Sequence, residues 1–379
     1  MNLRRLARGA QAPLIAAIAA ILVASIALLI AGDNPVDAFL EMWKTIDSTE
    51  SVVIILNKAV PFYVAGVAVA IGFKMNLFNI GADGQYRLAA LVAAAVGAAI
   101  DLPGPLHVLV ICITAVCVGA MWAAIAGILK VTRNVNEVIS TIMLNYIATG
   151  ISAFLLLEVS FFRNRNTASL AAETKPLPKS ARIPPLNELI ELFGFNLGRG
   201  VVLQGFLPYA VLLGIGYHLM LNRSRFGFEL RTSGLNPAAA QSAGVNPKAM
   251  ILKAIILSGA VAGLIGMSNL LADPQFGKFG DQFPKTLGFT GLSLALLGRN
   301  HPVGIAAAAL VWATIERATQ RLSLLGIPQE VGLILQGSFL LAAVIAYEVV
   351  NRRNQEATAR EAARRAEAVH GPAHSGVSA

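Results

Sequence analysis

Residues 75–87 read MNLFNIGADGQYR and lie between two long apolar runs. Asn79, Asp83 and Arg87 recur every four residues, so they would share one face of a helix, on which Asp83 and Arg87 could pair. Two glycines weaken that helix. If the apolar flanks cross a membrane, a polar segment of this kind faces protein or a solute pathway rather than lipid. The stretch therefore predicts either a structural polar clasp between helices or part of a solute route, and the sequence leaves both open.

The composition agrees with a membrane protein. Of 379 residues, 56% are hydrophobic and 13% are charged, and the mean hydropathy is +0.65. Soluble domains carry roughly a quarter charged residues, so a soluble enzyme is excluded. The net charge of +9 comes from basic residues between the apolar runs, and these are not interleaved with aromatic residues. Nucleic acid is therefore not an expected partner.

The apolar runs are long enough to cross a bilayer, which takes about 20 residues in a helix. The first run follows Arg4, Arg5 and Arg8 but is longer than the apolar part of a signal peptide, so we expect an uncleaved first span. The runs are 13–31, 51–72, 76–100, 105–129, 137–159, 201–221, 250–272, 285–298, 303–322 and 330–350. The prediction is an all-α membrane protein of about ten transmembrane helices, with a transmembrane domain over 1–350 and a charged, helical or disordered tail over 351–379.

Basic residues in the short loops predict the orientation. With the N-terminus inside, most of them fall in cytoplasmic loops, while the opposite short loops are mainly acidic. An even number of spans then places both termini in the cytoplasm. The long loop 160–200 would be external, and its amphipathic stretch 186–193 follows a Pro pair. That stretch is either an interfacial helix that ties the loop down or a docking surface for an external partner.

A cytoplasmic loop over 222–249 contains a second helix signal. Asn236 is suited to cap a helix that has Pro237 at its first position, and Gly244 is suited to end it. The helix would be short and rich in alanine, which favours insertion into a groove of a partner. The alternative is that it only ends a hairpin.

Residues 288–302, GFTGLSLALLGRNHP, form a second glycine-bounded segment that is barely long enough to span. If ten spans divide into two sets of five, the odd number forces opposite orientations, and both glycine-interrupted segments become the third of their set. This is the pattern of inverted repeats that meet at a central site. The repeat is a hypothesis, because sequence identity between the halves is too weak to establish it.

The sequence lacks the patterns of a catalytic or metal-binding protein. Gly277 and Lys278 are followed by Phe279 instead of Ser or Thr, so there is no phosphate-binding loop. The histidines and cysteines do not fall at zinc-ligand spacing, so we expect no metal. No arrangement for nucleophilic or acid–base catalysis is visible, so the chain is not expected to be an enzyme.

Four motifs in order resemble one family. Residues 78–85, FNIGADGQ, resemble the signature of ABC importer permeases of the branched-chain amino acid, ribose and nucleoside group. Residues 136–148, NEVISTIMLNYIA, and 295–304, ALLGRNHPVG, are similar to its simple-sugar and nucleoside-type permease subunits, and 234–244 resembles the family's coupling loop. The resemblance covers roughly 50–350. Asp83 stands where the family commonly has Glu, and His301 where Asn is common.

The resemblance implies a permease subunit in the plasma membrane that forms the solute path of an ATP-driven importer for nucleosides or simple sugars. Its implied partners are a cytoplasmic ATPase, an external solute-binding protein or lipoprotein, and a second permease, for which the nucleoside-type motifs favour a heterodimer over a homodimer. ATP would bind to the ATPase, so no cofactor is expected in this chain. The expected pathway residues are Asn79, Asp83, Gln85 and Asn145. The expected ATPase-coupling residues are Gly234, Asn236, Pro237, Ala239, Ala240 and Gly244.

A second hypothesis is an ion-coupled secondary transporter of small polar solutes. In that case an acidic side chain would relay protons, and the candidates are Asp83, Glu137, Glu316 and Glu348. A channel is disfavoured because no filter motif is visible. The sequence does not identify the solute, because a nucleoside, a pentose and a hexose need similar hydrogen-bond partners.

Overall fold

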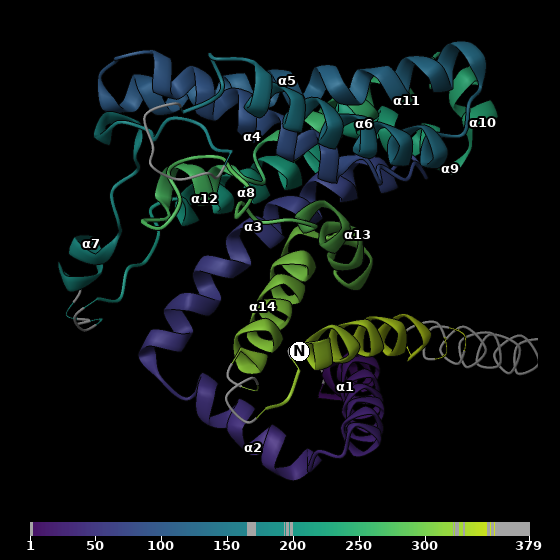
Figure 1. Cartoon of the computed structure of the whole chain (residues 1–379). Helices are drawn as coiled ribbons and strands as arrows, with labels where there is room; N and C mark the ends of the chain where they lie inside the picture. The colour runs from purple at the N-terminus through teal and green to yellow at the C-terminus, as the bar shows by residue number, and fades with distance from the viewer. Residues whose placement is uncertain are drawn as a thin grey trace, which may run out of the picture. The chain divides into compact units, whose positions relative to one another are not determined.

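The computed structural model describes residues 3–164, 172–192, 194, 197, 200–320, 322, 326–328, 330–346, 349 and 352 (Figure 1). These residues form helices joined by turns, with one isolated β-bridge between Glu173 and Gly280. The helices are α1 (Leu3–Ala31), α2 (Pro35–Ile46), α3 (Thr49–Phe73), α4 (Ala82–Ala99), α5 (Gly104–Arg133), α6 (Glu137–Glu158), η1 (Lys179–Ala181), α7 (Asn187–Leu192), α8 (Leu207–Arg223), α9 (Arg225–Leu235), α10 (Pro237–Ser242), α11 (Pro247–Gly263), α12 (Met267–Ala272), α13 (Leu287–Leu297) and α14 (Pro302–Thr319). A further apolar helix covers Glu330–Ala346.

The predicted all-helical architecture is confirmed, and each of the predicted apolar runs contains a helix. By length and composition, four segments in the described part are able to cross a membrane: Thr49–Phe73, Gly104–Arg133, Glu137–Glu158 and Pro247–Ala272. Shorter apolar helices cover Ala17–Ala31, Leu287–Leu297 and Glu330–Ala346. The total of ten crossings stays a prediction.

Two of the predicted runs are interrupted. The run 76–100 is helical only from Ala82, in keeping with the polar and glycine residues that precede it. The run 250–272 is divided into α11 and α12 by a turn over 264–266. The amphipathic helix α2 lies in a segment where no helix was predicted.

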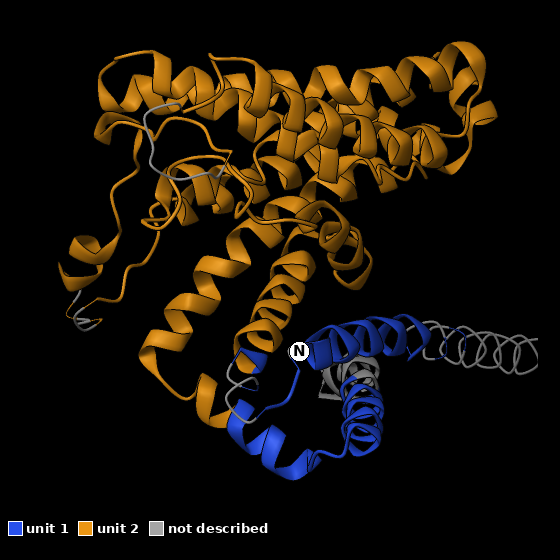
Figure 2. Cartoon of the chain, viewed as in Figure 1, with its two compact units in different colours: residues 1–42, 319–379 blue, residues 43–318 orange. Residues whose placement is uncertain are grey.

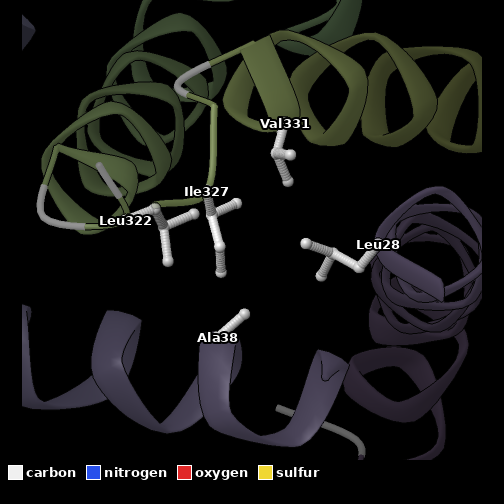
Figure 3. Close-up of a cluster of buried hydrophobic side chains, with 5 residues drawn as sticks. All are labelled: Leu28, Ala38, Leu322, Ile327 and Val331. Carbon is white, nitrogen blue, oxygen red and sulfur yellow. The ribbon is translucent and has the colours of Figure 1, made fainter. Parts of the chain in front are cut away.

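The chain forms two compact units (Figure 2). Unit 1 comprises residues 1–42 and 319–379, and unit 2 comprises 43–318. Unit 1 has its own apolar cluster, in which side chains from α1, α2 and the segment after α14 point toward one another (Figure 3). The cluster consists of Leu28, Ala38, Leu322, Ile327 and Val331, with Met42 packed against it. The predicted tail 351–379, apart from residue 352, lies outside the described residues, as does Glu348.

In unit 2, α5 and α11 pack extensively against each other and run side by side (Figure 1). A Cβ atom on Gly119 would lie 2.9 Å from the Gly263 nitrogen and would overlap the Gly259 carbonyl oxygen. In the same way, a Cβ on Gly259 would overlap the Cβ of Ala123. Small residues let the two backbones approach, which is a principal source of helix association in membranes.

The described part of the 160–200 loop is hydrogen-bonded to the segment before α13. The Thr174 N–H donates to the Phe279 carbonyl at 2.8 Å, and the Ile183 N–H donates to the Leu271 carbonyl at 2.8 Å. Glu173 also forms an ion pair with Lys278 at 2.6 Å. The helix predicted within 186–193 forms as α7, where Leu189 and Leu192 are exposed.

Gly259→Ala is expected to lower the apparent melting temperature in detergent, because the added methyl overlaps Ala123 and overpacking costs about 1–3 kcal/mol. Gly216→Ala in α8 is the matched control, since no atom lies within 4 Å of its missing Cβ and alanine favours a helix. Equal melting temperatures for the two variants would contradict the close α5–α11 packing.

Candidate functional site

The site is built around the interruption between α3 and α4. After α3 ends at Phe73, Asn76 adopts a left-handed conformation with φ of 54°, and the Leu77 N–H returns to the Gly72 carbonyl at 3.1 Å. The next helix begins only at Ala82. The backbone over 77–81 thus lacks the hydrogen bonds of a regular helix, and buried N–H and C=O groups must find other partners.

Asn79 and Gln85 form a reciprocal amide pair in the interior of unit 2. The Asn79 Nδ2 donates to the Gln85 Oε1 at 2.9 Å, and the Gln85 Nε2 donates to the Asn79 Oδ1 at 3.0 Å. The Asn79 Nδ2 also donates to the Ser258 Oγ of α11 at 2.8 Å. The Ser258 hydroxyl in turn donates to the Ala68 carbonyl of α3 at 2.7 Å. These side chains are at most 3% exposed, and together they join α3, α4 and α11.

Asn145 on α6 pairs with the backbone on both sides of the start of α4. Its Nδ2 donates to the Ile80 carbonyl at 2.9 Å, and its Oδ1 accepts the Gly84 N–H at 2.8 Å. A Cβ on Gly84 would lie 2.8 Å from that same Oδ1 and 3.0 Å from the Ala148 Cβ. The glycine is therefore required for α6 to approach closely enough for the amide to reach.

Asp83 faces the start of α13. Its Oδ1 accepts the Gly288 N–H at 3.3 Å, and a Cβ on Gly288 would overlap the Asp83 nitrogen. Asp83 and Arg87, which the sequence spacing allowed to pair, form no salt bridge, although the positive charge of Arg87 still attracts the carboxylate. The close approach of Gly288 gives the carboxylate a backbone partner instead, and the helix starts of α4 and α13 meet at this point.

The four predicted pathway residues thus lie in one cluster, which we call the polar cluster: Asn79, Asp83, Gln85, Asn145 and Ser258. Ser258 was not predicted, because a single serine in an apolar run carries no periodic signal. The amide groups of the cluster are used in hydrogen bonds within the chain. In this conformation the geometry corresponds to the polar clasp that the sequence left as one alternative.

A separate apolar groove of about 630 Å³ lies between α3, α8 and α14. Its wall includes Leu56, Val60, Leu207, Ile215, Val303 and Leu310. Polar atoms enter it from Tyr63, His218 and His301. The two imidazoles lie edge to face, with ring centroids 6.2 Å apart. The groove and the polar cluster contact different parts of α3, since Tyr63 lines the groove while the Ala68 carbonyl, five residues further along, binds Ser258.

An ion pair between Lys58 and Glu316 links α3 to α14, in the half of α3 that precedes Tyr63. Nearby, Arg317 lies 3.8 Å from Glu50 and donates to the Ser51 hydroxyl at 3.1 Å. Glu137 on α6 forms an ion pair with Lys130 on α5 at 2.8 Å.

The predicted cytoplasmic helix forms as α10, and α9 and α10 lie together at one end of α5 and α11 (Figure 1). Asn236 caps α10, since its Oδ1 accepts the Ala239 N–H at 3.0 Å. Pro237 is the first helical residue, and Gly244 adopts a φ of 81° after the helix. Ala240 is buried, whereas Ala239 is exposed.

The remaining predicted coupling residue, Gly234, lies near the end of α9 and packs against the Lys74 carbonyl. On the same helix Phe228 and Leu235 are 58% and 87% exposed. Arg231 of α9 lies near Lys74 at the end of α3, and burial together with this neighbouring positive charge lowers the pKa of Lys74. Among the described residues, no group of three or more His, Cys, Asp or Glu side chains is placed to hold a metal ion.

Residues 51–344 match the model of a protein family described as "Branched-chain amino acid transport system / permease component". The chain belongs to this permease family. It is therefore the multi-pass membrane component of an ABC transport system, as the motifs predicted.

The chain is similar along most of its length to known transporter subunits. It is 30% identical to the guanosine ABC transporter permease protein NupP of Bacillus subtilis over 339 residues, 89% of this chain and 93% of that protein. It is 32% identical to the glucose ABC transporter permease protein TsgB13 of Haloferax volcanii over 80% of this chain and 78% of that protein. It is 29% identical to the nucleoside ABC transporter permease protein NupB of Lactococcus lactis over 93% of this chain and 96% of that protein. No solved structure matches the chain.

Asn145→Ala is expected to lower the apparent melting temperature markedly, because it leaves the Ile80 carbonyl and the Gly84 N–H unpaired in the interior. Each buried polar group left unpaired costs about 1–3 kcal/mol. Asn222→Ala, which removes an exposed amide on α8, is the control and should change stability little. If both variants unfold at the wild-type temperature, Asn145 does not support the interruption.

Proposed function

We propose that the chain forms the solute path of an ATP-driven importer, with nucleosides as its substrates in preference to simple sugars. The observation that carries the proposal is similarity over nearly the full chain to permeases named for guanosine and for nucleosides. A glucose permease is equally similar, so the family alone does not decide the solute. The groove between α3, α8 and α14 supports a nucleoside, because its mainly apolar wall suits the flat face of a base better than a free sugar.

The solute route runs along this groove, and the polar cluster contacts the same helix, α3, further along its length. Asn79, Asp83, Gln85 and Asn145 hold α4, α6, α11 and α13 in position around it. Their amides and carboxylate are able to exchange hydrogen bonds with a hydroxylated solute when the helices move. The burial and internal pairing of these side chains support the role of holding the helices in position more than the role of binding solute.

The membrane topology comprises ten spans in an inverted 5+5 arrangement within a domain over 1–350, with both termini in the cytoplasm and the tail 351–379 beyond it. Support for the repeat comes from the corresponding starts of α4 and α13. Each helix follows an irregular segment containing a left-handed residue, Asn76 or Thr286, and the two starts meet at Asp83 and Gly288. Meeting helix starts at a central site are typical of inverted-repeat transporters.

The cytoplasmic ATPase docks on the coupling loop 222–249. Ala240 anchors α10 to the permease, while Ala239 and the apolar side chains of Phe228 and Leu235 face outward for a partner. Closure of the ATPase moves α9 and α10 and thereby rocks the bundle between inward-facing and outward-facing states. ATP is bound by that partner and not by this chain.

The remaining partners are a second permease, in a heterodimer rather than a homodimer, and an external solute-binding protein. The described part of the 160–200 loop supports an external docking surface, because its pairing with the segment before α13 makes it a fixed platform. The ion-coupled alternative is less well supported. Glu137 and Glu316 are paired with lysines, and Asp83 accepts a backbone N–H, so none of the three is poised as a simple relay.

Uptake of labelled guanosine into cells is expected to require both this chain and its ATPase, and excess unlabelled adenosine should compete better than excess glucose. Uptake that survives inactivation of the ATPase but collapses with the proton gradient would indicate the secondary transporter. Better competition by glucose would retain the importer but reject the nucleoside preference.

The docking surface is tested in the same cells with Ala239→Arg, which places a long charged side chain on the exposed face of α10. We expect co-purification of the ATPase and uptake each to fall at least about ten-fold. Thr132→Arg, at an exposed position near the end of α5, is the control and should retain both. Retention of ATPase binding by Ala239→Arg would contradict the placement of the ATPase on α10.

A further inference from the structure

Asn76 connects the coupling loop to the interruption between α3 and α4. Its Nδ2 donates to the Gly234 carbonyl of α9 at 2.8 Å, across 158 residues of sequence. The two backbones also touch, because a Cβ on Gly234 would overlap the Lys74 carbonyl and lie 3.0 Å from the Met75 Cα. The end of α9 therefore rests directly on the turn that follows α3.

Hydrogen bonds and an aromatic contact brace this turn. The Met75 and Leu77 N–H groups both donate to the Gly72 carbonyl, at 2.9 and 3.1 Å, and Asn76 lies between them at a φ of 54°. Phe73 and Phe78 pack edge to face across the turn, with ring centroids 5.1 Å apart. These contacts tie Asn76 to the residues on both sides of it.

The polar cluster begins three residues after Asn76, at Asn79, which binds Gln85 of α4 and Ser258 of α11. On the other side, the Asn236 N–H donates to the Thr232 carbonyl at 3.0 Å, so the end of α9 continues directly into the cap of α10. A continuous set of contacts thus joins α10, α9, the turn and the polar cluster.

We propose that Asn76 is a positioning residue that transmits the movement of the coupling loop to the polar cluster through its hydrogen bond to Gly234. This inference rests on the proposed docking of the ATPase at α10. Asn76 has no contact with the groove, so it acts on transport through α9 and Asn79. Because this hydrogen bond is exposed, it contributes little to stability. A loss of coupling in an Asn76 variant can therefore be distinguished from a loss of structure.

The competing explanation is that Asn76 is present only because asparagine tolerates the left-handed conformation. Asn76→Gly distinguishes the two, because glycine adopts that conformation freely but lacks the amide. Asn76→Asp retains the shape but has no N–H to donate to Gly234. Asn134 provides the matched control: it ends α5 at a φ of 52°, and the structure gives its side chain no hydrogen bond.

The test uses the complete transporter in proteoliposomes, with ATP hydrolysis and guanosine uptake measured in parallel. For Asn76→Gly and Asn76→Asp we expect wild-type ATPase binding and melting temperature, and about five-fold less guanosine imported per ATP hydrolysed. Asn134→Gly should retain the wild-type ratio.

A wild-type ratio in both Asn76 variants would overturn the inference while leaving the importer intact, and so would an equal loss in Asn134→Gly. A loss of ATPase binding in the Asn76 variants would also overturn it, because the residue would then act on docking and not on transmission. Wild-type uptake that proceeds without the ATPase would overturn the proposed function together with this inference.

Discussion

The backbone between α3 and α4 sets the central constraint on this protein. A helix that stops inside an apolar bundle leaves N–H and C=O groups that neither lipid nor an apolar side chain satisfies. Here Asn145 of α6 supplies partners for the Ile80 carbonyl and the Gly84 N–H, and Ser258 of α11 accepts a hydrogen bond from the Asn79 side chain. These contacts tie the interruption to two neighbouring helices.

The same interruption brings the remote parts of unit 2 together. The start of α4 meets the start of α13 through Asp83 and Gly288. The turn after α3 contacts the end of α9, where Asn76 donates to the Gly234 carbonyl. The groove contacts a separate part of α3 and contains few polar groups. In the proposed mechanism, hydrogen bonds hold the helices in position and the apolar wall of the groove faces the solute.

Sequence reasoning located the polar cluster because its members belong to short motifs whose residue types are costly in a membrane. It also predicted the cap at Asn236 and the helix after it, since these depend on neighbouring residues only. It did not find Ser258, whose partner Asn79 lies 179 residues away, and it allowed an Asp83–Arg87 pair that the approach of α13 replaces. The close packing of α5 on α11 was not predicted for the same reason. The need for a glycine at position 119 follows only from the facing backbone of α11, which the sequence does not identify. Local chemistry was predictable, whereas pairing between distant helices was not.

The most direct test of this account is amide hydrogen exchange, measured by mass spectrometry on the protein in nanodiscs, for peptides covering 77–85. Because the Gly84 N–H donates to Asn145 of α6, the peptide that contains Gly84 should exchange this amide as slowly as the amides of the flanking helices, and Asn145→Ala should accelerate its exchange selectively. Rapid exchange of the Gly84 amide in the wild-type protein would contradict the account, because it would mean that Asn145 does not hold the start of α4.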